Sequence, residues 1–282
     1  MKSLQELQSI ATQVRRDILR MTTAAKSGHP GGSLGTADWF VAMNFNIMDF
    51  DPQKFTMSGE GEDMLFVSQG HITPVIYSVM ARRGYFPVSE LSTFRRFGTR
   101  LQGHPCVTDA LPGVFQSSGS LGQGLSCAAG MALGKKLDGA PERVYCLLGD
   151  GESEEGQIWE AGMWAAHHKL DNLIAFTDWN GQQIDGPVED VAGEGDLAAK
   201  WEAWGWKVIV ADGHDFPSIN QAFELAKANA GSGKPVMILF KSDMGHGVDF
   251  MAGTHKWHGS VPKPEQLEDA LRQLGETPLG DF

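Results

Sequence analysis

Five short, mostly apolar runs, alternating with segments of helical pattern, place the strongest constraint on the fold of this chain. The runs occupy residues 64–67, 143–148, 172–177, 206–210 and 235–240. Such runs are typical of strands buried on both faces of a parallel sheet. The helical segments provide the long connections that parallel strands need. The sequence therefore predicts an α/β fold with a doubly wound, mostly parallel sheet flanked by helices.

Polar residues follow two of these predicted strands. Asp150 stands between two glycines after the run 143–148, and Asn180 follows the run 172–177. Ligands bind at the carboxyl ends of strands in open α/β sheets, and glycine lets the backbone come close to them. Carboxylate and amide oxygens suit Mg²⁺ or Ca²⁺, and Mg²⁺ completes its shell with water and substrate phosphates. The pair predicts a metal ion that carries a diphosphate, although Gly-Asp-Gly by itself is more often a plain turn.

Three histidines each follow a glycine in loops rich in glycine or proline. They are His29, His71 and His104. A single histidine of this kind is more often a structural residue, and a glycine-rich stretch after a helix is more often a cap and turn. Three such steps are harder to attribute to chance. Because imidazole pKa values lie near neutrality, these histidines are candidates for binding a substrate and moving protons.

Taken together, these motifs resemble the transketolase family. The matching segments run in order from residue 28 to residue 263 and cover most of the chain. They are Ser27-Gly28-His29-Pro30-Gly31-Gly32, Gly119-Ser120-Leu121-Gly122-Gln123-Gly124, Gly149-Asp150-Gly151 through Glu155-Gly156 to Asn180, Ile184-Asp185-Gly186, and Gly253-Thr254-His255-Lys256-Trp257-His258-Gly259. Ser120 and Trp179 depart from the family pattern, and neither position needs to contact the metal. The resemblance implies a thiamine diphosphate-binding fold over residues 1–282, as one diphosphate-binding domain without the pyrimidine-binding and C-terminal domains.

The resemblance also implies roles for individual residues. Mg²⁺, with Ca²⁺ or Mn²⁺ as substitutes, would lie on Asp150, Asn180 and the carbonyl of Gln182. The implied cofactor contacts are His71, Gly119, Leu121, Gly149, Asp150, Gly151, Asn180, Ile184 and His255. The implied catalytic histidines are His29, His71, His104 and His255, and Glu155 and Glu160 match residues that couple two active sites across a subunit interface. For either glutamate alone, a solvated partner of the helix dipole is the more common role.

The implied activity is transfer of a two-carbon ketol unit from a ketose, by default a phosphorylated one, to an aldose, as in pentose phosphate metabolism. Sulfonated and branched sugars remain open. In transketolases the glutamate that activates the cofactor lies on a second domain. The resemblance therefore implies the N-terminal subunit of a split enzyme, completed by a separate C-terminal subunit in a dimer of heterodimers. A subunit of another thiamine diphosphate enzyme, of decarboxylase or dehydrogenase type, and a non-catalytic cofactor-binding protein are the alternatives.

Composition limits the partners and the compartment. The formal net charge is −12, which disfavours nucleic acid and acidic membranes as partners. The three cysteines have no metal-binding spacing, and Cys146 lies inside a predicted strand. The N-terminus has no signal-peptide pattern, and no apolar run approaches the ~20 residues of a membrane span. We expect a soluble cytoplasmic protein.

Overall fold

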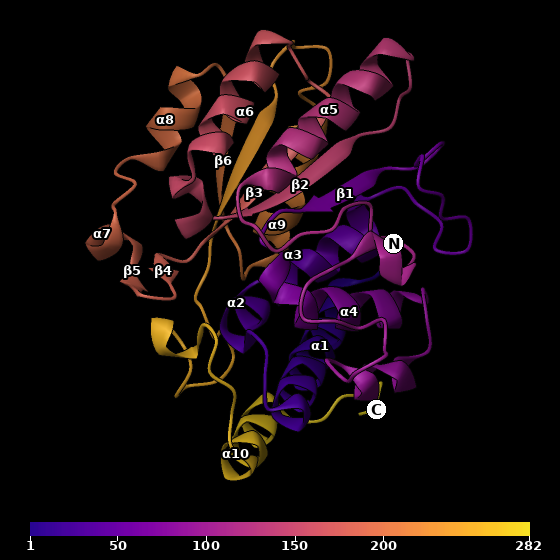
Figure 1. Cartoon of the computed structure of the whole chain (residues 1–282), viewed down its shortest axis with the longest axis vertical. Coiled ribbons are helices and arrows are strands. Elements are labelled where there is room, and N and C mark those ends of the chain that lie inside the picture. Colours follow the sequence, from indigo (N-terminus) through magenta and orange to yellow (C-terminus); the bar gives the residue numbers. More distant parts are fainter.

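The computed structural model describes all 282 residues and has a five-stranded parallel sheet at its centre (Figure 1). The strands lie in the order β1-β2-β3-β7-β6, and each pairs in parallel with its neighbour. Their bounds are β1 Met64–Val67, β2 Val144–Gly149, β3 Leu173–Trp179, β6 Lys207–Asp212 and β7 Val236–Lys241. A small antiparallel hairpin, β4 Gln182–Gln183 and β5 Gly186–Pro187, follows β3. All five strands predicted from the sequence are confirmed.

Helices cover both faces of the sheet and create two hydrophobic cores. One face packs against α1 Leu4–Ala25, α3 Ala37–Ala42, α4 Thr73–Arg83 and α9 Phe216–Lys227. The other face packs against α5 Gln123–Leu137, α6 Gly156–His167 and α8 Leu197–Ala203. Alternate residues of each strand point to opposite faces, so Leu147 joins the first core whereas Cys146 and Leu148 join the second. Every residue of β2 is buried, as expected for a central strand covered on both sides.

The segment after His29 is a short helix, although the sequence favours a loop there. This helix, α2 Pro30–Gly35, begins with proline at its first position, where the fixed φ and the missing N–H suit a helix start. A Cβ on Gly31 would lie 2.7 Å from the carbonyl oxygen of Trp257, so only glycine allows this approach. The α2 helix thereby brings His29 close to the segment that follows β7.

The remaining elements are short or lie at the periphery. A π-helical turn, Met43–Ile47, follows α3, and 3-10 turns cover Gly70–Ile72, Val88–Thr93, Val107–Asp109, Gly151–Glu154 and His255–Trp257. The helices α7 Val188–Val191 and α10 Pro264–Leu274 complete the chain, and α10 packs against α1 at the lower end of Figure 1. Arg16 of α1 pairs with Asp281 beside the C-terminus.

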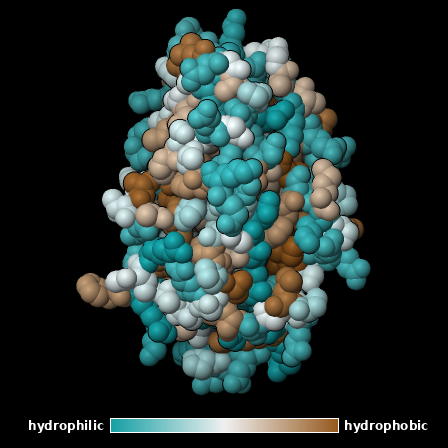
Figure 2. All heavy atoms as spheres, turned by 90° about the vertical axis from the view of Figure 1, so that its right-hand side faces the viewer, coloured by the Kyte–Doolittle hydropathy of each residue, from teal (hydrophilic) through white to brown (hydrophobic).

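The visible surface is mostly hydrophilic. On the face shown in Figure 2, hydrophilic side chains dominate and apolar ones are scattered among them. No helix combines the length and the hydrophobicity needed to cross a membrane. The tryptophans Trp201 and Trp206 are buried in the second core and pack against each other.

Candidate active site

A polar cavity of about 360 Å³ lies at the carboxyl ends of β2 and β3. This is the edge at which the sequence predicts a ligand. Most of the predicted site residues line it, whereas His104, His255 and Glu160 do not. The predicted residues on its wall are His29, His71, Gly119, Leu121, Gly149, Asp150, Gly151, Glu155, Asn180, Gln182 and Ile184.

Asp150 joins the turns that follow β2 and β3. One of its carboxylate oxygens, Oδ1, accepts the N–H of Gly151 at 2.7 Å, and the other accepts the N–H of Gly181. The backbone N–H of Asp150 donates to the carbonyl of Asp178 at 3.2 Å. These bonds hold Asp150 beside the turn that carries Asn180, as the parallel pairing of the two strands requires.

Asn180 is oriented by its neighbours on the same turn. Its amide nitrogen donates to Oδ2 of Asp178 at 2.9 Å, and its Oδ1 accepts the N–H of Gln182 at 2.9 Å. Asp178 also accepts the hydroxyl of Ser242. These contacts direct the amide oxygen of Asn180 away from Asp178 and toward the Gln182 turn.

The carboxylates at this end of the cavity lie in an environment suited to a cation. Burial and the neighbouring Asp178 raise the pKa of Asp150 well above its usual value. Burial also raises the pKa of Asp178 to about 6. Two buried carboxylates that lack a basic partner are costly to keep ionised, and a divalent cation would offset that cost. The oxygen donors Asp150, Asn180 and Gln182 thus fit Mg²⁺ bound to a diphosphate.

Three histidine rings meet at the same cavity. The ring centroids of His29 and His71 are 5.1 Å apart, and those of His29 and His258 are 5.5 Å apart. His71 and His258 complete the triangle at 4.9 Å. His104 lies just outside it, with its centroid 6.3 Å from that of His29 and its side chain exposed. The structure therefore brings together the three histidine loops predicted from the sequence.

Burial keeps these imidazoles neutral. It lowers the pKa of His29 to about 4, and the neighbouring His258 and Arg95 contribute to the same shift. The pKa of His71 is lowered well below its usual value, and that of His258 is also lowered, in both cases mainly by burial. The Nδ1 atoms of His29 and His258 are buried without a hydrogen-bond partner. Neutral imidazoles with free nitrogen atoms suit hydrogen bonding to carbonyl and hydroxyl oxygens of a sugar.

The segment after β7 contributes His258 to this cluster. The sequence motif predicts His255 in this role, and His255 lies three residues earlier in a 3-10 turn. The structure places His255 outside the cavity, where its backbone N–H donates to Oε1 of Gln182 at 3.2 Å. His255 and His258 have similar neighbours in the sequence, so only the course of the 3-10 turn shows which of them lines the cavity.

Gln69 and Glu152 are further residues of this site that the sequence did not reveal. Gln69 is buried on the cavity wall, and its Nε2 has no hydrogen-bond partner. Such an orphaned donor fits an anionic ligand. Glu152 also lines the cavity, in the turn after Asp150, and burial raises its pKa to about 6. Its neighbours Glu154 and Glu155 are glutamates too, so nothing in the sequence distinguished Glu152 from a glutamate on a solvent-exposed face.

Glu155 and Glu160 lie at the start of α6. Glu155 is the residue that precedes the helix, and both side chains are exposed. Neither forms a salt bridge within the chain. Their exposure leaves them available to a neighbouring chain.

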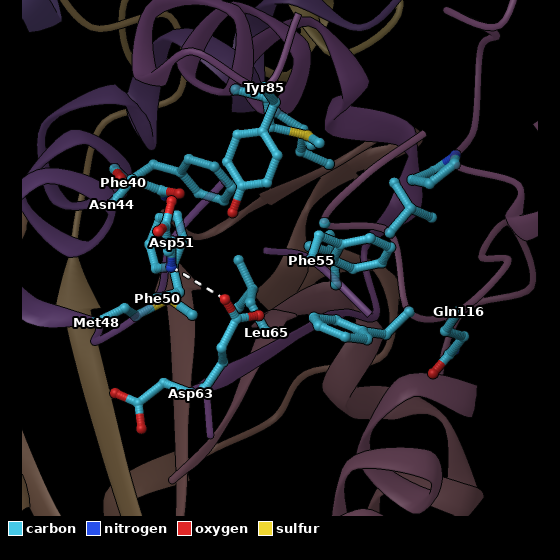
Figure 3. Close-up of a pocket in the computed structure, with 18 residues that line it drawn as sticks. Phe40, Asn44, Met48, Phe50, Asp51, Phe55, Asp63, Leu65, Tyr85 and Gln116 are labelled. Atoms are coloured by element: carbon cyan, nitrogen blue, oxygen red, sulfur yellow. Dashed lines mark hydrogen bonds between the residues drawn. The ribbon is translucent and has the colours of Figure 1, made fainter. Parts of the chain in front are cut away.

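A second cavity, of about 50 Å³, lies between β1, α4 and the segment 48–63 and is lined mainly by aromatic and aliphatic side chains (Figure 3). The N–H of Asp51 donates to Oε1 of Glu62 at 3.0 Å across its rim, as the dashed line shows. Its volume is smaller than the ~150 Å³ of an engineered cavity that holds benzene. A diphosphate cofactor does not fit there. The polar cavity is the candidate active site because it gathers the oxygen donors after β2 and β3 and the buried histidines.

Comparison with known proteins identifies the family. Residues 7–282 match the family model described as transketolase, thiamine diphosphate binding domain. The chain belongs to the transketolase family. This match confirms the resemblance that the sequence motifs indicate and the prediction of a thiamine diphosphate-binding domain.

Proteins described as transketolase subunits match this transketolase chain over almost their whole length. The 6-deoxy-6-sulfo-D-fructose transketolase subunit of Clostridium sp. (strain MSTE9) is 40% identical over 269 residues, which cover 95% of this chain and 96% of the relative. An apulose-4-phosphate transketolase subunit of Phocaeicola vulgatus is 35% identical, with 96% of this chain and 94% of the relative covered. The predicted similarity to one subunit of a split transketolase is thereby confirmed.

Solved transketolases share the fold of this chain. Transketolase from Pichia stipitis in complex with sedoheptulose-7-phosphate superposes with a TM-score of 0.90 and 31% identity, over 98% of this chain and 41% of the solved one. Transketolase from Campylobacter jejuni gives a TM-score of 0.89 with 33% identity, over 99% and 44% of the two chains. The chain thus spans less than half the length of these solved transketolases, and the predicted fold class is confirmed.

Proposed function

We propose that this chain is the diphosphate-binding half of a transketolase that transfers a two-carbon ketol unit from a phosphorylated ketose to an aldose. One observation carries the proposal: the oxygen donors after β2 and β3 and the neutral histidines face the same cavity of about 360 Å³. The oxygen donors would hold the metal ion that a diphosphate needs, and the histidines would bond the hydroxyl groups of a sugar. The match of the whole chain to the transketolase thiamine diphosphate binding domain supports the same assignment.

In this proposal Asp150, Asn180 and the carbonyl of Gln182 hold Mg²⁺, and the metal holds the diphosphate. Ca²⁺ and Mn²⁺ would substitute, since both accept oxygen ligands. The other contacts to the cofactor come from the wall of the cavity, where Gly149, Gly151, Gly119, Leu121, Ile184 and His71 lie. Once bound, thiamine diphosphate would supply the nucleophilic carbon that attacks the ketose carbonyl.

The chain's own contribution to the chemistry is made by histidines. With its pKa lowered to about 4, His29 is neutral at neutral pH and can donate one hydrogen bond while accepting another. His258 has the same capacity and lies against His29 and His71. His104 is exposed beside this histidine cluster. In this proposal it contacts the outer part of a bound sugar. We assign the binding of the sugar oxygens and the movement of their protons to four histidines, His29, His71, His104 and His258.

A separate chain completes the site in this proposal. The relatives that match over almost their whole length are described as subunits, whereas single-chain transketolases are more than twice as long. The partner would supply the glutamate that activates the cofactor and the groups that grip the far end of the sugar. We propose a dimer of heterodimers in which the exposed Glu155 and Glu160 couple the two active sites.

The substrate is proposed from chemistry and from relatives. A phosphorylated ketose is the default donor. The descriptions of two relatives name 6-deoxy-6-sulfo-D-fructose and apulose-4-phosphate, so sulfonated and branched sugars are the specific alternatives.

The test is reconstitution with the protein encoded beside this one. Cleavage of a phosphorylated, a sulfonated and a branched donor ketose is measured with each chain alone and with the mixture, always with thiamine diphosphate and Mg²⁺. The proposal expects turnover only in the mixture, fastest with the phosphorylated donor. Turnover by this chain alone would exclude a shared site, and faster cleavage of another donor would replace the substrate assignment.

A further inference from the structure

Glu152 is a buried carboxylate bonded by neutral donors only. Its side chain lies in the 3-10 turn after Asp150, and the residue is 4% exposed. Oε1 accepts the backbone N–H of Gly122 at 2.7 Å and the hydroxyl of Ser68. Oε2 accepts the backbone N–H of Gly149 at 3.0 Å. Both oxygens are therefore occupied, and none of these bonds involves a basic side chain.

The three donors belong to segments that are far apart in the sequence. Ser68 follows β1, Gly149 ends β2, and Gly122 is the residue that precedes α5. The network extends one step further, because the N–H of Gly124 donates to Oγ of Ser68 at 3.0 Å. The packing there is tight, since a Cβ on Gly124 would lie 2.5 Å from Cβ of Ser68. One carboxylate thus ties the start of α5 to the ends of two neighbouring strands.

These tied segments form two walls of the active-site cavity. The loop that leads into α5 contributes Gly119 and Leu121, and the end of β2 contributes Gly149 and Asp150. The hydrogen bonds of Glu152 join these two walls, so they set the distance between them. We propose that Glu152 is a positioning residue that holds the loop 119–122 at the distance from Asp150 that thiamine diphosphate requires. This inference rests on the proposed function.

The chemistry of the side chain favours this role over simple packing. An ionised carboxylate offers only acceptors, so it can receive three donors at once. A glutamine of the same shape would turn its amide group toward Gly122 and Ser68 or toward Gly149, and would face a donor with a donor. Burying a carboxylate without a cation is costly, and packing alone would be better served by an apolar side chain. A charged side chain at this buried position is thus explained by the three hydrogen-bond donors that Glu152 holds in place.

The test compares Glu152→Gln with a matched control, Glu62→Gln. Glu62 is also buried, at 8% exposure, and accepts a backbone N–H, that of Asp51, but it lies on the apolar cavity. The dissociation constant of thiamine diphosphate with Mg²⁺ is measured by calorimetry, and hydrogen exchange of backbone amides is measured without cofactor. Loss of an outer-shell partner of a metal site typically costs 10- to 100-fold in affinity, and Glu152 holds Gly149, which precedes Asp150. We therefore expect a loss of about that size for Glu152→Gln and less than threefold for Glu62→Gln.

Hydrogen exchange gives the readout that a merely stabilising residue would not move. In Glu152→Gln, the amides of Gly122, Gly124 and Gly149 should exchange at least tenfold faster, while amides of α9 keep their protection. If Glu152→Gln does not fold, Ser68→Ala carries the test, because it removes one donor and leaves the carboxylate. That variant should show faster exchange of the amides of Gly122 and Gly124, and unchanged exchange there would overturn the positioning role. If both variants fold, their effects should not add.

The outcomes separate this inference from the function on which it rests. Wild-type cofactor affinity together with unchanged exchange in Glu152→Gln would overturn the positioning role. Equal losses of affinity in Glu152→Gln and Glu62→Gln would overturn it as well, since the effect would then be general destabilisation. Failure of the wild-type chain to bind thiamine diphosphate both alone and in the mixture with its partner would refute the proposed function, and the exchange of Gly122 and Gly149 would still decide whether Glu152 holds the loop.

Discussion

His258 and His71 lie with their ring centroids 4.9 Å apart, although one follows β7 and the other follows β1. The contact joins the segment beyond β7 to the loop beyond an edge strand of the sheet, and His29 from the start of α2 lies against both rings. The sheet topology therefore assembles the histidine wall of the cavity from three distant segments.

Replacing His258 should impair the reaction more than replacing His255. The ring of His258 lines the cavity, whereas His255 contacts the site only through its backbone N–H, which alanine retains. Loss of a positioned acid or base typically costs 10²- to 10⁴-fold in rate. We expect a fall of about that size in kcat/KM of donor-ketose cleavage for His258→Ala, measured with the reconstituted enzyme, and less than tenfold for His255→Ala. The reverse order would favour His255 over His258 as the catalytic histidine.

Stability should depend on pH through His29. Its folded pKa of about 4 lies below the 6.5 of an ordinary histidine. Between these two values the unfolded chain binds more protons than the folded one, so stability falls as the pH is lowered through this window. The slope from one proton is at most about 1.4 kcal/mol per pH unit.

The buried carboxylates Asp178 and Glu152, with raised pKa values, act in the opposite direction. A comparison with His29→Gln therefore isolates the contribution of His29. Denaturant unfolding at several pH values should show the wild type losing stability relative to His29→Gln between about pH 6.5 and pH 4. A difference that is independent of pH would contradict the burial of a neutral His29.

Gly31 should tolerate no side chain, whereas Gly130 should accept one. A Cβ on Gly31 would lie 2.7 Å from the backbone oxygen of Trp257, and forcing apart a packed contact typically costs 1–3 kcal/mol. A Cβ on Gly130, inside α5, meets nothing within 4 Å, and alanine is favoured over glycine in helices by about 1 kcal/mol.

Thermal unfolding of Gly31→Ala and Gly130→Ala checks this expectation. The first variant should unfold at a lower temperature and the second at a higher one than the wild type. Because Trp257 precedes His258, Gly31→Ala should also weaken ketose cleavage. An unchanged melting temperature for Gly31→Ala would show that the close approach of α2 to Trp257 is absent.

Much of the fold follows from local sequence patterns. The strands were predictable because each is a short apolar run with helical segments on either side, and a residue such as Cys146 has no other plausible place than the core. The site at the ends of β2 and β3 was predictable for the same reason, since parallel neighbours bring Asp150 and the Asn180 turn to one edge. These predictions need only periodicity and sheet topology.

Other features depend on tertiary contacts that no local pattern encodes. The glycines after Pro30 disfavour a helix locally, and the close approach of Gly31 to the backbone of Trp257 is a tertiary contact that no local pattern reveals. His255 and His258 cannot be distinguished until the turn between them is placed. Glu152 has two glutamates nearby, and its burial becomes evident only when Ser68 and Gly122 are seen beside it.

The most direct test of a metal-bound diphosphate in this cavity is calorimetric titration of thiamine diphosphate into the enzyme reconstituted from this chain and its partner, with Mg²⁺ and with excess chelator, in the wild type and in Asp150→Asn. If the metal ion on Asp150 holds the diphosphate, binding requires Mg²⁺, is restored when Mg²⁺ is returned, and is weakened at least 100-fold in Asp150→Asn, while the variant remains folded. Equal affinity with and without Mg²⁺, or wild-type affinity in Asp150→Asn, would contradict the assignment of the cavity to a metal-bound diphosphate.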